Sequence, residues 1–172
     1  MSLSDQSTDP DYVDRRSCRV AVDSQRAFAP IRRIGGEAGW YYANFLWWVR
    51  GAADRLVGGV GMKRGRREPD TLKIGDVVDC WRVEDYRDGE FLRLALEMKL
   101  PGRGWLQFEV RGNGDHSQIT QTALFEPKGV LGAIYWYASF PIHHVLFRGM
   151  LRAIAEAAQK TPHATKVSVP GL

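Results

Sequence analysis

The residue best placed for chemistry is an aspartate in a strand-like segment, residues 76–84. Side chains alternate between the two faces of a strand, so one of two sets must face the interior. The two sets are Val77, Asp79, Trp81 and Val83, or Val78, Cys80, Arg82 and Glu84. The first set is more apolar, so we expect Asp79 and Trp81 to point inward. A buried carboxyl group can orient a ligand or transfer a proton, or it can simply bind neighbouring backbone N–H groups.

A glutamine has the same character in another strand-like segment, residues 117–125. Its face is otherwise apolar, so Gln121 is expected inside. Residues 91–98 and 105–111 form the strands between these two, and their apolar faces bring Leu96 and Phe108 inward. One carboxyl and one amide group in an apolar enclosure fit a site for a small molecule, although each can instead satisfy local backbone or a buried water.

Two adjacent histidines follow Pro141 in a helical segment. Neighbouring residues on a helix point about 100° apart, so one histidine faces the sheet and the other faces solvent. No cysteine or acidic residue stands three or four positions away, so we expect no metal site. His144 is the candidate acid–base group because imidazole titrates near neutral pH, and a packed or surface histidine is the alternative.

A stretch of aromatic residues that ends in basic ones occupies residues 39–67. Arg50 and Asp54 are four positions apart and can form an ion pair, or Arg50 can contact a ligand. The basic run Lys63–Arg67 can hold a ligand carboxylate or phosphate, or it can cap the preceding helix. The glycines at 59–65 follow a helix rather than a strand, which argues against a dinucleotide-binding loop. The sequence contains no second basic patch with interleaved aromatic residues, so we expect no binding of nucleic acid.

The elements that position these residues change period twice along the chain. Apolar spacing predicts a short strand at 18–22, helices at 23–34 and 39–57, four antiparallel strands, and a long helix at 127–159 that Pro141 kinks or splits. An apolar stripe of this last helix is expected to face the sheet, and Tyr137, Phe147, Met150, Leu151 and Ile154 widen it. The stripe consists of Leu131, Ile134, Tyr135, Ala138, Ile142, Val145, Gly149, Ala153 and Ala157. Residues 1–16 are expected to form a disordered arm, 17–160 one domain, and 161–172 a loose tail.

Bulk properties fit one soluble domain. The chain has 172 residues, a net charge of +4 and two cysteines, Cys18 and Cys80, which we expect to be buried free thiols. No signal peptide and no membrane-spanning run are visible, so a cytoplasmic location without membrane contact is expected. The predicted order is α+β: a curved antiparallel sheet wrapped around a long C-terminal helix, with two short helices after the first strand. This is a helix-grip arrangement, which often encloses a cavity.

Four segments together resemble a known family. They are GWYYANFLWWVRGAADRLVGGVGMKRGRR, LKIGDVVDCWRVE, EMKLPGRGWLQFEV and QTALFEPKGVLGAIYWYASFPIHHVLFRGM, and they span about residues 30–158. In order and spacing they resemble the DUF2867 family of unknown function, itself similar to the START/Bet v1-like SRPBCC superfamily of hydrophobic-ligand-binding helix-grip folds. The family is often found C-terminal to an NAD-binding Rossmann domain, which this sequence does not contain.

The resemblance implies a function in broad terms only. It implies binding of a small hydrophobic or aromatic ligand in a cavity between the sheet and the last helix. We expect no cofactor. The expected ligand contacts, from strand alternation and aromatic content, are Arg50, Asp79, Trp81, Leu96, Phe108, Gln121, Trp136 and His144. Two alternatives stay open: a polyketide cyclase- or dehydratase-like enzyme using Asp79, Gln121 and His144, or an accessory domain that partners a Rossmann-type oxidoreductase.

Overall fold

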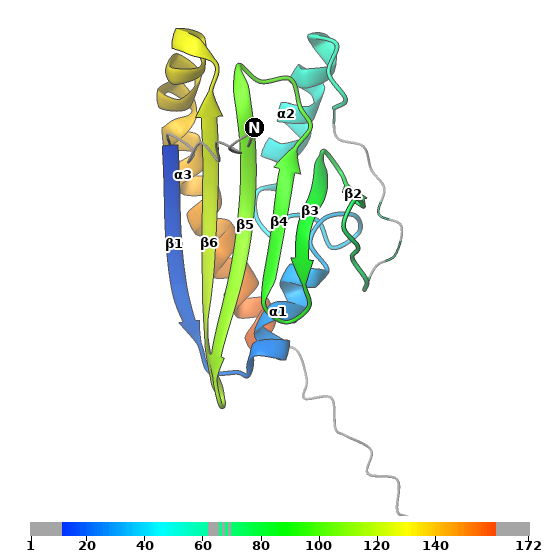
Figure 1. The fold of residues 1–172 in the computed structure, drawn as a ribbon, viewed down its shortest axis with the longest axis vertical. Helices are drawn as coiled ribbons and strands as arrows, with labels where there is room; N and C mark the ends of the chain where they lie inside the picture. The colour runs from blue at the N-terminus through cyan, green and yellow to red at the C-terminus, as the bar shows by residue number, and fades with distance from the viewer. Residues whose placement is uncertain (1–11, 62–65, 67, 69, 161–172) are drawn as a thin grey trace, which may run out of the picture.

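The fold is built on one antiparallel sheet. The structure is a computed structural model that describes residues 12–61, 66, 68 and 70–160. The strands are β1 (Tyr12–Val20), β2 (Val77–Val78), β3 (Trp81–Arg87), β4 (Phe91–Leu96), β5 (Gly102–Asn113) and β6 (His116–Pro127). Their order across the sheet is β1-β6-β5-β4-β3-β2, and all neighbours are antiparallel. From β2 to β6 the chain therefore runs as a meander, and β1 closes the far edge (Figure 1).

Three helices lie on one side of this sheet. They are α1 (Ser24–Arg32), α2 (Asn44–Leu56) and α3 (Gly129–Lys160). Figure 1 shows α3 running diagonally behind the sheet, with α1 near its lower end and α2 at the upper right. The expected α+β helix-grip arrangement, with two short helices after the first strand and a long C-terminal helix on the sheet, is therefore confirmed.

The inner faces of the central strands agree with their alternation. Leu92, Leu94, Leu106, Phe108, Val110 and Ile119 are all fully or almost fully buried. On the other face of the sheet, Arg93 pairs with Glu84 at 3.2 Å and Arg82 pairs with Glu97. The predicted inward direction of these strands is confirmed, and the apolar face packs against the helices.

The first strand is longer than expected. Composition predicts a disordered arm that includes Tyr12 to Arg16, but these residues pair with β6, from Tyr12 opposite Phe125 to Arg16 opposite Gln121. Their exposure alternates along the strand, and the Tyr12 ring stacks on Trp136 with centroids 5.2 Å apart. Most residues of this segment are polar, so the sequence shows no apolar alternation that would predict a strand. The rest of the expected arm, residues 1–11, and the expected tail, 161–172, lie outside the described residues.

The second helix begins five residues later than its apolar spacing predicted. Gly39, Tyr41 and Ala43 all have positive φ angles, between 51° and 66°, so the chain before Asn44 cannot be helical. The Asn44 side chain accepts a hydrogen bond from the Trp40 backbone N–H at 2.9 Å and closes this turn. The buried face of α2 consists of Trp47, Gly51 and Asp54, while Phe45 and Leu56 are exposed. The helix ends as predicted, at the glycines after Val57.

The long C-terminal helix contains Pro141 and is not split by it. Its buried residues are Gly132, Trp136, Leu146, Phe147, Met150, Leu151, Ile154, Ala155 and Ala158. The expected stripe was wrong in its first half, where Leu131 is 72% exposed and Ile134, Ile142 and Val145 are each 58% exposed. A helix that is apolar nearly all round gives no periodic signal for which side faces the core. Among the described residues, no helix is both long and apolar enough to cross a lipid bilayer.

Both cysteines are free thiols. Cys80 is fully buried, as expected, and burial raises the pKa of its thiol to about 12. Cys18 is half-buried on β1, and burial raises its pKa as well. Neither thiol is prepared to act as a nucleophile, because the reactive thiolate form is disfavoured at both positions.

Candidate functional site

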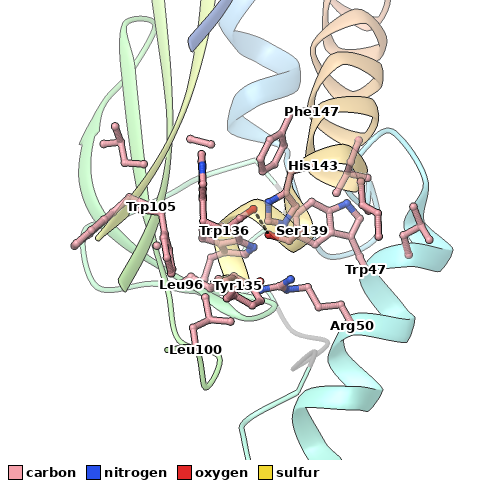
Figure 2. A pocket seen from close by; sticks show the side chains of 18 of the residues that line it. Trp47, Arg50, Leu96, Leu100, Trp105, Tyr135, Trp136, Ser139, His143 and Phe147 are labelled. Atoms are coloured by element: carbon pink, nitrogen blue, oxygen red, sulfur yellow. Dashed lines mark hydrogen bonds between the residues drawn. The ribbon is translucent and has the colours of Figure 1, made fainter. Parts of the chain in front are cut away.

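A cavity of about 240 Å³ lies between α2, the sheet and α3. Helix α2 contributes Leu46, Trp47, Val49, Arg50 and Ala53, and α3 contributes Tyr135, Trp136, Ser139, Ile142, His143, Leu146 and Phe147. The sheet side consists of Trp81, Leu96, Leu100, Gly104, Trp105, Ala123, Leu124 and Phe125. Figure 2 shows these side chains converging from both helices and the sheet. Most of them are apolar, so the cavity is suited to an apolar molecule.

Aromatic rings form two walls of this cavity. On one side, the Trp47 centroid lies 5.1 Å from that of Trp40 and 6.3 Å from that of Trp81. On the other side, Trp136 stacks on Phe125 with centroids 5.8 Å apart. Packed aromatic rings lose little conformational entropy when a ligand contacts them, because they are already fixed by their neighbours.

Arg50 is the one arginine or lysine among the lining residues. Its guanidinium carbon lies 5.7 Å from the centre of the Tyr135 ring, and Figure 2 shows it extending from α2 toward that ring. The predicted Arg50–Asp54 ion pair is not formed. Asp54 is buried and instead accepts hydrogen bonds from the backbone N–H groups of Gly61 and Lys99, each at 2.8 Å.

The histidine at the cavity is His143 and not the expected His144. Its ring stacks on Phe147 with centroids 5.3 Å apart. Burial, with a smaller contribution from Arg50, lowers its pKa to about 4, so the ring is neutral at pH 7. His144 is exposed, and its Nδ1 lies 3.1 Å from an Arg16 nitrogen on β1. The prediction for His144 was wrong because the sequence does not determine which side of α3 faces the sheet.

This lowered pKa gives the protein a measurable pH dependence. Between about pH 6.5 and about pH 4 the unfolded chain binds a proton at His143 and the folded chain does not, so stability falls as the pH falls through this window. The loss from this residue is expected to reach at most about 3 kcal/mol. In chemical unfolding measured from pH 7 downward, His143→Leu should flatten this slope and the exposed His144→Leu should not. Equal slopes in the wild type and His143→Leu would contradict the assignment.

Asp79 is buried, as predicted, but its carboxylate binds other parts of the fold. It lies in the two-residue turn between β2 and β3 with a φ angle of 56°, so residues 76–84 form two short strands and not one. Its Oδ2 accepts hydrogen bonds from the Trp40 indole N–H at 2.9 Å and from the Gly36 backbone N–H at 3.3 Å. Asp79 is not among the residues that line the cavity.

Gln121 and Phe108 also point inward without lining the cavity. The Gln121 amide donates to the Phe147 backbone carbonyl at 3.3 Å and so ties β6 to α3. Phe108 is fully buried deeper between sheet and helices. With His144 exposed, the three groups expected to supply acid–base chemistry are not brought together.

One arginine of the basic run, Arg66, has a structural role. The Arg66 guanidinium donates to the backbone carbonyls of Arg32, Ile34 and Glu68, with the Ile34 bond at 2.9 Å. It therefore caps the end of α1, whereas the sequence suggested a cap on α2 or a ligand contact. Lys63, Arg64 and Arg67 lie outside the described residues.

Of the eight expected contacts, the structure places Arg50, Trp81, Leu96 and Trp136 at the cavity. The residues that the sequence analysis missed include Tyr135, Ser139 and His143, which all come from α3. The adjacent histidines were a signal, and the four-residue spacing of Ser139 and His143 was another. Neither signal identifies a cavity residue until it is known which side of α3 faces the sheet.

Comparison with known proteins identifies the family. Residues 7–150 match the family described as "Protein of unknown function (DUF2867)". No curated protein matches the chain. Among solved structures, norcoclaurine synthase from Thalictrum flavum has a TM-score of 0.53 at 10% identity, with 87% of each chain covered. The Zhui aromatase/cyclase from Streptomyces sp. R1128 has a TM-score of 0.50 at 14% identity, covering 86% of this chain and 93% of that one.

The di-domain aromatase/cyclase BexL from the BE-7585A biosynthetic pathway has a TM-score of 0.51 at 10% identity. The alignment covers 86% of this chain, which spans about half of that protein, 46% of its length. At such identities the likeness establishes a shared fold and not a shared activity. Together with the family match and the architecture, these likenesses identify the chain as a member of the DUF2867 family with a Bet v1-like helix-grip fold.

Proposed function

We propose that the protein binds a small, largely apolar molecule in the cavity between α2, the sheet and α3. The observation that carries the proposal is the cavity itself, about 240 Å³ in volume and lined mainly by aliphatic and aromatic side chains. Ligand sites are typically apolar hollows with a few polar groups that fix orientation, and this hollow has that composition. The Bet v1-like fold is commonly used for ligand binding, which supports the proposal at the level of the fold.

A pair of neighbouring alanines on α2 allows a controlled test. Both are exposed, but Ala53 lines the cavity and Ala52 does not. We expect Ala53→Trp to fill part of the cavity and to weaken binding of the neutral fluorescent probe N-phenyl-1-naphthylamine by about tenfold, the effect of losing ~60 Å² of apolar contact. Ala52→Trp should leave the affinity within about twofold, well below the 1.4 kcal/mol of a tenfold change. The measurement is fluorescence titration of both variants and the wild type.

Two results count against the proposal. One is failure of the wild type to bind the probe with saturable, one-to-one stoichiometry. The other is equal affinity in the Ala53→Trp and Ala52→Trp variants, which would mean that the probe binds elsewhere.

The enzyme alternative lacks its predicted constellation. Asp79, Gln121 and His144 lie at a turn, against a backbone carbonyl and at the surface, respectively. A polyketide cyclase- or dehydratase-like activity therefore has no residue trio to support it, although two aromatase/cyclases share the fold. Partnership with a Rossmann-type oxidoreductase stays a prediction of the family resemblance.

A further inference from the structure

We infer that the ligand is an organic anion: an apolar body with a negatively charged oxygen group that pairs with Arg50. The inference rests on the proposed function, because it names the class of molecule that the same cavity accepts. It comes from the charges and the unpartnered polar atoms at the cavity, which the proposed function does not use.

The cavity has a positive charge and no negative one to balance it. Arg50 lines it, and none of the lining residues is an aspartate or a glutamate. Among the described residues, neither an ion pair nor a hydrogen bond involves the Arg50 guanidinium. Its nearest partner in sequence, Asp54, is occupied by the backbone N–H groups of Gly61 and Lys99.

Unpartnered polar atoms collect around the same space. Among the described residues, the buried polar atoms without a hydrogen-bond partner include Trp47 Nε1, Trp81 Nε1, Tyr135 Oη and His143 Nδ1. All four residues line the cavity, and the two tryptophans are each only 4% exposed. A buried polar group without a partner costs about 1–3 kcal/mol, so such groups seldom gather without something to bind.

The balance of these groups favours a ligand that accepts hydrogen bonds. Indole and guanidinium N–H groups only donate, and the tyrosine hydroxyl can donate as well. Neutral His143 adds no second positive charge, so a single anionic group suffices to balance Arg50. A carboxylate, sulfonate or enolate oxygen would meet these donors, while the aromatic walls contact the rest of the molecule.

Two fluorescent probes isolate the charge. 1-Anilinonaphthalene-8-sulfonate and N-phenyl-1-naphthylamine share one aromatic body, and only the first carries an anionic group. In the wild type both should bind. We expect Arg50→Gln to weaken the sulfonate probe by about tenfold or more, which corresponds to the loss of one charge-assisted contact, and to change the neutral probe by less than about twofold.

The matched control removes the same charge elsewhere. Arg148 is exposed on α3 and does not line the cavity, so Arg148→Gln should affect neither probe. Thermal unfolding of each variant establishes that it is folded before the titrations are compared.

The other results of these titrations would overturn the inference, the proposed function or both. Equal weakening of both probes by Arg50→Gln, or no effect on either, overturns the inference and leaves the proposed function standing, because the neutral probe still reports the cavity. Equal weakening of the sulfonate probe by Arg50→Gln and Arg148→Gln also overturns it, since general surface charge then explains the binding. If the wild type binds neither probe, both the inference and the proposed function fail.

Discussion

Replacing Asp54 with alanine is expected to destabilise the protein by about 3–5 kcal/mol, because two backbone N–H groups lose a carboxylate acceptor. Each oxygen of Asp54 accepts one bond, Oδ2 from Gly61 and Oδ1 from Lys99. The side chain is only 6% exposed and lies directly against Gly59, where a Cβ atom would come within 2.2 Å of its oxygens. Water therefore has little room to replace the lost acceptor.

The asparagine variant sharpens this prediction. An amide offers one acceptor oxygen, and its NH₂ group would face the other backbone N–H, so Asp54→Asn should lose about half as much stability as Asp54→Ala. The exposed Asp70, which pairs with Arg33 at 3.0 Å, gives the matched control. Asp70→Ala is expected to change stability by less than about 1 kcal/mol. The measurement is urea unfolding followed by tryptophan fluorescence, and similar midpoints for the Asp54 and Asp70 variants would contradict this account.

Replacing Asp79 with alanine is expected to cost about 3 kcal/mol, from a strained left-handed backbone and from the lost partner of the Trp40 indole. Aspartate tolerates a φ angle of 56° better than alanine does, because its short polar side chain can bind nearby backbone. The indole N–H of Trp40, which is 1% exposed, would be left without its acceptor at 2.9 Å.

Asp79→Asn provides the control for this second prediction. Asparagine keeps an oxygen that can accept from Trp40, and it is also tolerated in the left-handed region, so the loss should stay near 1 kcal/mol. Urea unfolding would measure both variants. The two contributions are wrongly assigned if alanine and asparagine destabilise the protein equally.

The sequence predicted the parts of the fold that alternation determines. Leu94 and Leu106 were placed inside correctly because a strand has only two faces, and one of them is clearly more apolar. The helix at Ser24 was also found, with Asp23 accepting from the Arg26 backbone N–H as its cap.

Helix phase was where sequence reasoning failed. In α3 apolar residues surround the helix, so the choice between His143 and His144 depended on the position of the sheet. Asp79 failed for a different reason. Its burial was predicted, but its carboxylate binds Trp40 and Gly36, which lie about forty residues earlier in the chain, and local spacing does not encode such contacts.

Half of the expected site residues were nevertheless found at the cavity. Trp81, Leu96 and Trp136 are large apolar residues on inward positions, which pattern and composition can identify. Arg50 was predicted either to pair with Asp54 or to contact a ligand, and it lines the cavity. Only the structure shows that Asp54 is engaged elsewhere, which leaves the arginine available.

The pairing of β1 with β6 also orders the events of folding. Strands β5 and β6 are joined by a two-residue turn with Gly114 in the left-handed conformation, so they can pair as soon as both are synthesised. Strand β1 meets β6 only across roughly a hundred intervening residues, and closing so long a loop carries an entropic cost that grows with its length. The nascent chain therefore releases its first strand long before that strand's partner exists. The Tyr12 ring can stack on Trp136 only after residue 136 of the last helix has been synthesised.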